Sequence, residues 1–263
     1  LCATIGPGIR EFLYRRPDRR RERLTMYTFD SRVRYSETDE EGRLTVTGII
    51  NYMQDCSTFH SEDVGVGVGY LGEHRRIWLL SSWQIVIDRY PRLGERLTVG
   101  TWHNDFKGIY GYRNFVLRDL GGNDCVRAAS VWFLYDLEKE QPIRVTSADT
   151  DPYGEPEPRL DLGKAPRKIP VPEHLEAVEP VVVARHHLDT NHHVNNAQYV
   201  EIAREAVPAG ITIREIRADY KKAALLGDVI VPRVACGEDK CYTVVLGSET
   251  GEIYAVVWLR AEA

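Results

Sequence analysis

The sequence predicts an α+β protein built from two similar halves, and three observations support this prediction. Each half has one segment with helical spacing of apolar residues, next to several β-like runs that end at Gly, Pro or Asn. A polar turn with an aspartate precedes each helical segment, Asp39 in the first half and Asp189 in the second. A proline-rich stretch separates the halves. One face of each antiparallel sheet needs a cover, and the helix of the same half can supply it.

The first half begins with a strand-like run over residues 27–35 and a polar turn over residues 36–42. Thr45 or Thr47 is placed to cap the helix that follows, and Gly65 is placed to end it. β-like runs come next, and the Gly-containing breaks between them are typical of hairpins. These runs cover residues 77–90, 96–106, 110–119 and 125–135.

The second half repeats this order after a stretch rich in proline, residues 150–172, which is typical of a semi-rigid linker. A strand, a polar turn and a helix through Tyr199 precede β-like runs over residues 211–220, 229–235, 242–246 and 253–259. We therefore divide the chain into an N-terminal domain (26–150), a linker (151–172) and a C-terminal domain (173–263). The arginine-rich residues 1–25 are expected to be a disordered or non-native extension, because the patterned sequence starts at Met26.

Composition disfavours several classes of protein. Of the 263 residues, 43% are hydrophobic and 28% are charged, as in a globular protein with a core. No apolar run is long enough to cross a bilayer, so no stable membrane insertion is expected. A formal net charge of -5 argues against a nucleic-acid partner. The five cysteines are scattered and odd in number, which favours free thiols in a cytoplasmic protein.

The most informative stretch for chemistry is the polar turn of the second half. Asp189, Asn191 and His193 fall at alternate positions where a strand should give way to a helix. Free backbone N–H groups at a helix start favour an oxyanion, so this turn can bind a carbonyl and help water attack it. Asp and Asn before a helix are also ordinary N-caps. The four nearby histidines do not have the usual spacing of zinc ligands, so we expect no metal.

The same turn resembles the catalytic signature of the acyl-acyl-carrier-protein thioesterases, which reads Asp-x-Asn-x-His-Val-Asn-Asn-x-x-Tyr over residues 189–199. Residues 76–80, 87–91 and 97–102 resemble first-half strands of that family, and residues 219–222 resemble its second-half signature. The resemblance implies a tandem (double) hotdog, with two antiparallel sheets that are each wrapped on a long helix and join side by side. It also implies hydrolysis of fatty acyl-acyl-carrier-protein, which releases free fatty acid and terminates fatty acid synthesis, without a cofactor.

The resemblance assigns roles to three residues. Asp189 is expected to be the base or the direct nucleophile, and Asn191 to orient the acyl carbonyl or the attacking water. His193 is expected to be the acid–base partner. The oxyanion is expected near backbone N–H groups at the start of the second helix. Asn195, Asn196 and Tyr199 are expected to hold the turn and pack the helix, while Glu201 and Glu205 are expected to be solvated charges.

The chain departs from the plant members of the family at two positions. Those members carry Glu and Cys where this chain has Ala223 and Ala224, so a thiol nucleophile is not available there. The first half lacks the Asn-x-His element after Asp39, and by the same resemblance it is expected to supply the acyl-chain pocket. Candidates to line that pocket, for which ordinary core packing is the alternative, are Met53, Trp78, Leu80, Trp83 and Ile85.

The expected partner is acyl carrier protein, and a homodimer is left open. Basic residues proposed to contact this acidic carrier are Lys221, Lys222, Arg214 and Arg217. The alternative with the same chemistry is an acyl-CoA thioesterase. A non-catalytic acyl-binding hotdog is the alternative from another class, and a hotdog dehydratase is the third. The sequence does not indicate the preferred acyl chain length.

Overall fold

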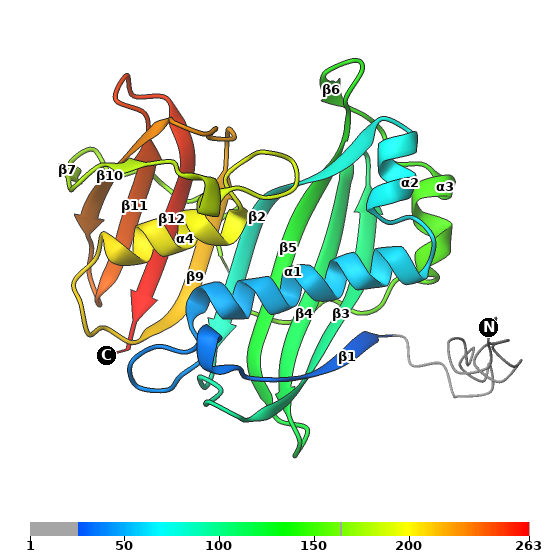
Figure 1. Ribbon diagram of the computed structural model, residues 1–263, viewed down its shortest axis with the longest axis horizontal. Helices are drawn as coiled ribbons and strands as arrows, with labels where there is room; N and C mark the ends of the chain where they lie inside the picture. The colour runs from blue at the N-terminus through cyan, green and yellow to red at the C-terminus, as the bar shows by residue number, and fades with distance from the viewer. Residues whose placement is uncertain (1–25, 164, 263) are drawn as a thin grey trace, which may run out of the picture.

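A single antiparallel sheet runs through the whole molecule, and its two main helices, α1 and α4, lie on one face of it (Figure 1). The computed structural model describes residues 26–163 and 165–262. The predicted extension, residues 1–25, lies outside the described residues. The helices are α1 (Val46–Asp63), α2 (Val68–Glu73), α3 (Ser147–Thr150) and α4 (Asn196–Glu205), with 3-10 turns η1 (Tyr35–Glu37), η2 (Asp151–Tyr153) and η3 (Arg185–His187).

The strands alternate with the hairpin breaks that the sequence predicts. The first half contains β1 (Tyr27–Arg32), β2 (Arg76–Ile87), β3 (Arg96–Lys107), β4 (Tyr110–Asp119), β5 (Asp124–Asp136) and β6 (Gln141–Pro142). The second contains β7 (Glu176–Ala177), β8 (Val181–Val182), β9 (Ile213–Tyr220), β10 (Val229–Cys236), β11 (Cys241–Gly247) and β12 (Ile253–Ala261). Along the sheet the order is β1-β3-β4-β5-β2-β9-β12-β11-β10-β7.

Strands β2 and β9 join the two halves. Residues 82–86 of β2 pair antiparallel with residues 215–219 of β9, and this pairing makes the sheet continuous. Each half therefore contributes a helix on a sheet, and the two sheets meet edge to edge. This arrangement confirms the predicted α+β class and the side-by-side junction.

Helix α1 packs on the sheet through its apolar face and begins at a side-chain N-cap. Ile49, Ile50 and Met53 are fully buried against the sheet, and replacing one such side chain by alanine typically costs about 2–5 kcal/mol. The Thr45 side chain accepts a hydrogen bond from the Gly48 backbone N–H at 3.0 Å. Of the two predicted caps, Thr45 is therefore the one that the structure uses.

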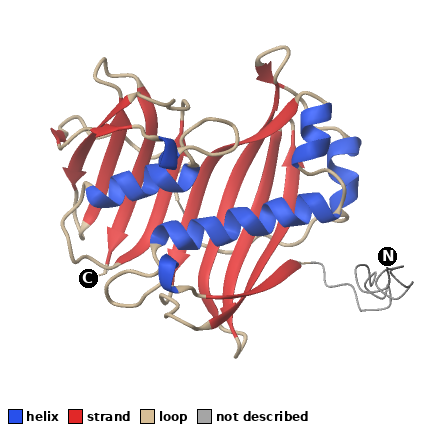
Figure 2. Ribbon diagram, in the orientation of Figure 1, coloured by secondary structure: helices blue, strands red, loops and turns tan. Residues whose placement is uncertain are grey.

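Helices α1 and α4 run in opposite directions where they lie side by side, and both lie in front of the sheet in Figure 2. The Thr47 hydroxyl donates to the Glu201 carboxylate at 2.5 Å. Gln54, two turns further along α1, meets Asn196 at the start of α4, where the amides bond at 3.1 Å. Glu201, which is predicted to be a solvated charge, is half-buried and bonds to Thr47 of the other half, whereas Glu205 is exposed.

The proline-rich linker covers part of the opposite face of the sheet. The Trp102 indole donates to the Pro158 carbonyl at 2.9 Å, and the Ile169 backbone N–H donates to Asp219 Oδ2 at 2.9 Å. Arg217 donates to the Pro166 carbonyl and is only 9% exposed. The prediction that Arg217 lies on a docking surface is therefore wrong, because the linker buries this side chain.

One rung of the sheet beneath the helices is polar in the first half and apolar in the second. Strand pairing puts His103 opposite Arg113, Arg113 opposite Ser130, and Ser130 opposite Trp83. The same rung continues through Ala218, Val257 and Val244. Arg113 donates to Nδ1 of His60 on α1 at 3.0 Å, which places this guanidinium beneath α1. Among the described residues Arg113 forms no ion pair, although it is only 8% exposed.

Candidate active site

The predicted catalytic residues share one tight turn between η3 and α4. The Asp189 Oδ1 atom accepts the backbone N–H groups of Asn191 at 2.8 Å and of His193 at 3.4 Å. The Asp189 N–H donates to the His193 carbonyl at 2.8 Å, and His192 takes a positive φ of 61°. The backbone thus brings Asp189, Asn191 and His193 together at the start of α4. Asn191 is exposed, whereas Asp189 and His193 are half-buried.

The first half contains a copy of this turn around Asp39. The Asp39 Oδ1 atom accepts the backbone N–H groups of Glu41 at 3.0 Å and of Arg43 at 2.8 Å. The Asp39 N–H donates to the Arg43 carbonyl at 2.9 Å, and Gly42 takes a positive φ of 69°. The positive φ explains the glycine, because other residues rarely adopt it. In both turns one carboxylate oxygen therefore stabilises the backbone.

The two turns differ at the second carboxylate oxygen. In the first half Arg43 Nε lies 3.1 Å from Asp39 Oδ2 and forms an ion pair. Burial alone would raise the pKa of Asp39, but hydrogen bonds from the Arg43 backbone and side chain outweigh burial and lower it. In the second half His193 takes the place of Arg43, and Asp189 Oδ2 has no hydrogen-bond partner among the described residues. Only the Asp189 turn leaves a carboxylate oxygen free for chemistry.

The start of α4 offers fewer free backbone donors than the sequence predicts. Asn195 is the N-cap, and its side chain accepts the Ala197 N–H at 2.9 Å. The Val194 and Asn195 N–H groups donate to the carbonyls of Ala224 and His187. Within residues 191–198, all of which are described, Asn196 is the residue whose backbone N–H has no partner. The predicted row of free donors is therefore reduced to a single candidate.

One tyrosine from α4 and one from β9 form hydrogen bonds to the backbone next to the turn. The Ala224 N–H donates to the Tyr199 hydroxyl at 2.7 Å, and the Tyr220 hydroxyl donates to the Asn196 carbonyl at 3.0 Å. Burial raises the pKa of Tyr199 to about 12, so this hydroxyl stays protonated at neutral pH. The contacts of Asn195 and Tyr199 agree with the expected role of holding the turn and packing the helix. Ala224 is fully buried beside Tyr199.

The five predicted pocket residues lie on α1 and β2. Met53, Leu80, Trp83 and Ile85 belong to the hydrophobic core, and Trp78 is half-buried against Phe106, with 6.2 Å between ring centroids. The Trp83 indole N–H is buried without a hydrogen-bond partner in the described part of the chain. Ordinary core packing explains the positions of the other four side chains equally well, so the role of these residues in an acyl pocket stays a prediction.

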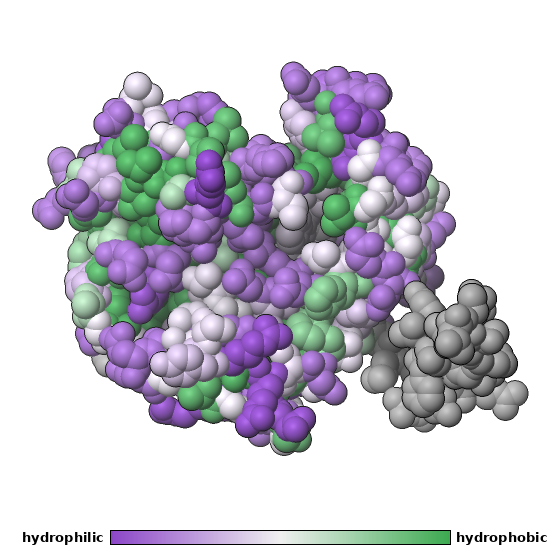
Figure 3. All heavy atoms as spheres, in the orientation of Figure 1, coloured by the Kyte–Doolittle hydropathy of each residue, from purple (hydrophilic) through white to green (hydrophobic). Residues whose placement is uncertain are grey.

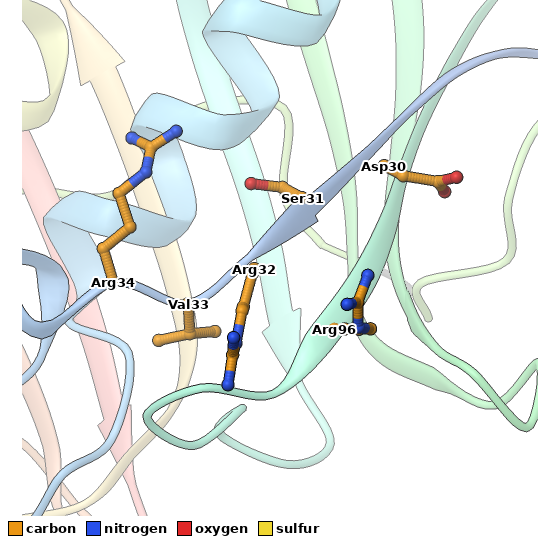
Figure 4. A pocket seen from close by; sticks show the side chains of 6 residues that line it. All are labelled: Asp30, Ser31, Arg32, Val33, Arg34 and Arg96. Atoms are coloured by element: carbon orange, nitrogen blue, oxygen red, sulfur yellow. The ribbon is translucent and has the colours of Figure 1, made fainter.

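An open hollow on the surface is lined by none of the residues of this turn. It has a volume of about 440 Å³ and is formed along the β1 edge (Figure 4) by Asp30, Ser31, Arg32, Val33, Arg34 and Arg96. None of the predicted site residues lines it. A smaller crevice lies between the halves beside the Asp39 turn, and its lining includes Asp39, Arg43 and Arg204.

The described residues show no group of three or more His, Cys, Asp or Glu side chains arranged to hold a metal. In the same part of the chain, no helix is both long and apolar enough to cross a membrane. Apolar side chains are exposed close to the turn, with Leu225 at 50% and Leu226 at 55%. Figure 3 shows apolar surface over the C-terminal half, at the left of this face.

Sequence reasoning missed Gln54 as a site residue. Its side-chain amide donates to Asn195 Oδ1 at 3.4 Å and accepts from Asn196 Nδ2 at 3.1 Å. The signal in the sequence was a polar residue beside the buried Met53 on α1, but the partners of Gln54 lie in the other half of the chain.

The fold and the two related turns define a tandem hotdog protein with one open aspartate turn. Comparison with known proteins agrees with this description. The model of the acyl-ACP thioesterase N-terminal domain matches residues 25–153, and that of the C-terminal domain matches residues 173–255. The chain belongs to the acyl-ACP thioesterase family.

Two relatives come from Arabidopsis thaliana chloroplasts. The oleoyl-acyl carrier protein thioesterase 2 is 26% identical over 221 residues, which are 75% of this chain and 59% of the relative. The palmitoyl-acyl carrier protein thioesterase is 26% identical over 239 residues, which are 84% of this chain and 55% of the relative. The chain thus spans little more than half the length of these curated relatives.

Solved structures share the fold. An acyl-ACP thioesterase from Bacteroides thetaiotaomicron superposes with a TM-score of 0.81 at 23% identity, covering 90% of this chain and 98% of that one. A 12:0-ACP thioesterase from Umbellularia californica gives 0.78 at 18% identity, covering 90% and 97%. These likenesses confirm the predicted double hotdog fold.

Proposed function

We propose that this protein hydrolyses the thioester of fatty acyl-acyl-carrier-protein and releases the free fatty acid. The observation that carries the proposal is the open Oδ2 atom of Asp189 in a turn that also holds Asn191 and His193. The copy of the turn around Asp39 acts as an internal comparison, because Arg43 occupies the same oxygen there. Membership of the acyl-ACP thioesterase family supports the substrate class.

The proposed reaction breaks the C–S bond of the thioester with one water. Asp189 removes a proton from water while the water oxygen adds to the carbonyl carbon, or else Asp189 adds first and water hydrolyses the resulting anhydride. Asn191 orients the carbonyl or the water. The oxyanion accepts the Asn196 N–H, and His193 donates a proton to the leaving thiolate. The products are a carboxylic acid and the carrier thiol.

The acyl chain is proposed to lie in the first half, beneath α1. Met53 on α1 and Leu80, Trp83 and Ile85 on β2 are the candidates to contact the chain, because all four belong to the same buried core. The unpartnered Trp83 N–H supports this placement, because a buried polar group without a partner costs about 1–3 kcal/mol and is rarely kept without a role. Trp78 lines the same strand nearer to its start.

The experiment that tests the proposal is incubation with a series of acyl-acyl-carrier-proteins and analysis of the released acids. Acyl-CoA with the same chains serves as the comparison for the carrier. Release from the carrier protein at a higher kcat/KM supports the proposal, whereas faster release from CoA favours the alternative carrier. Loss of water from a 3-hydroxyacyl substrate, with no release of acid, would point to a dehydratase instead.

A further inference from the structure

Gln54 connects the first half of the chain to the catalytic turn of the second. Its amide forms two hydrogen bonds, to the side chains of Asn195 and Asn196, and both partners come from the other half. The side chain is half-buried on α1, next to the fully buried Met53. Helix α1 therefore packs on its own sheet and also contacts the start of α4 in the other half.

The two asparagines that Gln54 holds lie where the catalytic turn becomes α4. Asn195 uses the same Oδ1 atom to cap the helix through Ala197, so its side chain is fixed from both sides. The backbone N–H of Asn196 is the donor without a partner at this helix start. A shift of these residues moves that N–H relative to Asp189.

We propose that Gln54 is a positioning residue, which holds the Asn195–Asn196 pair so that the Asn196 N–H faces the oxyanion that forms beside Asp189. This inference rests on the proposed hydrolysis and adds to it a requirement for the first half. Each half supplies part of one site: the acid and the histidine come from the second half, and the alignment of the donor comes from the first.

A second hydrogen bond between the same helices provides a matched control. Thr47 on α1 donates to Glu201 on α4, which lies further along α4 than the pair held by Gln54. Thr47→Val removes this bond and leaves the turn untouched. Both variants weaken the contact between the helices, but only Gln54→Leu releases the start of α4.

The first measurement is steady-state hydrolysis of acyl-acyl-carrier-protein. Gln54→Leu is expected to lower kcat by about tenfold to a hundredfold, the range that small misplacements of reacting groups cause, with KM within twofold. Thr47→Val is expected to keep kcat within twofold. Equal losses in the two variants, or an unchanged kcat in Gln54→Leu, would overturn the proposal.

The conservative variant Gln54→Glu separates positioning from simple packing. A protonated carboxyl can donate and accept as the amide does, but a carboxylate can only accept, and its charge opposes the oxyanion. The ratio of its kcat to the wild-type kcat is therefore expected to fall as pH rises. A ratio independent of pH would contradict the proposal.

A measurement without turnover keeps the inference separate from the proposed function. Hydrogen exchange at the Ala197 amide, which Asn195 caps, is expected to speed up in Gln54→Leu and not in Thr47→Val. If the wild-type protein hydrolyses no acyl thioester, the proposed function fails while this exchange test still decides whether Gln54 holds the helix start. Unchanged exchange in Gln54→Leu would refute the positioning role.

Discussion

Arg43 Nε lies 3.1 Å from Asp39 Oδ2, and this ion pair closes the carboxylate that corresponds to Asp189 in the other half. The backbone of the two turns is otherwise held by the same hydrogen bonds. Four side chains differ between the two turns, and the exchange of Arg43 for His193 is the one that leaves Asp189 Oδ2 without a partner among the described residues.

Installing the arginine of the first half in the second should close the site. We expect His193→Arg to pair with Asp189 Oδ2 and lower hydrolysis by at least about a hundredfold, the typical contribution of acid–base catalysis. The thermal midpoint should not fall, because a partly exposed ion pair contributes about 0–1 kcal/mol. Arg43→His is the control and should keep wild-type turnover. Retention of more than a tenth of the turnover by His193→Arg would contradict the assignment.

Hydrolysis should not depend on any thiol. Burial raises the pKa of Cys56 to about 12 and that of Cys125 to about 11, and burial also raises the pKa of Cys241. A thiol nucleophile needs the opposite shift. Ala224 supplies no thiol beside the turn. Activity should survive iodoacetamide and replacement of the cysteines by serine or alanine. Stoichiometric inactivation by alkylation at one cysteine, prevented by substrate, would require a different mechanism.

The loop over residues 221–226 is expected to contact the carrier protein. The Val194 N–H donates to the Ala224 carbonyl at 3.0 Å, so this loop touches the catalytic turn. It exposes Lys221 and Lys222, although Lys221 Nζ lies 3.7 Å from Asp219 Oδ2 and Lys222 Nζ lies 2.7 Å from a Glu252 carboxylate oxygen. The exposed Leu225 and Leu226 lie at the end of the same loop. Basic side chains beside a site complement an acidic partner, and the leucines add apolar contact area.

Replacing both leucines tests this surface. Leu225→Ser with Leu226→Ser should raise KM for acyl-acyl-carrier-protein several-fold and leave KM for acyl-pantetheine unchanged, because only the first substrate carries the protein. Leu120→Ser, at a side chain that is 77% exposed in another hairpin, is the control. An equal change for both substrates would show that the leucines do not contact the carrier.

His60 should make the protein less stable in mild acid. Burial, together with Arg113 and His103, lowers the pKa of His60 to about 3. Its ring also stacks on Tyr27 with 4.8 Å between centroids and meets Tyr153 edge-on at 5.1 Å. The unfolded chain binds a proton near pH 6.5, so stability is lost as pH falls from about 6.5 towards 3.

The matched variant His60→Gln lacks this proton. The free energy of unfolding, measured in urea at pH 7 and at pH 4.5, should therefore fall less in His60→Gln than in the wild-type protein. The pKa of His103 is lowered in both proteins, so its contribution to the pH dependence of the unfolding free energy cancels in the comparison. An equal fall in the two proteins would show that His60 is not kept neutral by its surroundings.

Local patterns were sufficient to predict most of the fold. The run over residues 110–119 coincides with β4, and β3 extends one residue beyond its predicted end at Phe106. Alternation and glycine breaks are local properties, so a sequence displays them directly. The choice between Thr45 and Thr47 as the cap needed the tertiary structure, because Thr47 bonds to Glu201 instead.

The site was predictable as a motif but not as an assembly. The Asp189 turn is one short stretch, whereas Gln54 acts on Asn195 and Asn196 from the other half. Burial of Arg217 depends on a linker carbonyl that composition does not place. Capping of the α4 start by Asn195 removed donors that the helix rule alone would leave free.

The central claim is that the open Asp189 carboxylate performs the hydrolysis. Its most direct test compares kcat/KM for acyl-acyl-carrier-protein in Asp189→Asn and Asp39→Asn. Asparagine keeps the oxygen that caps each turn, so both variants should fold. We predict a loss of at least about a hundredfold for Asp189→Asn and a value within twofold of wild type for Asp39→Asn. Wild-type-like hydrolysis by Asp189→Asn, or an equal loss in both variants, would contradict this account.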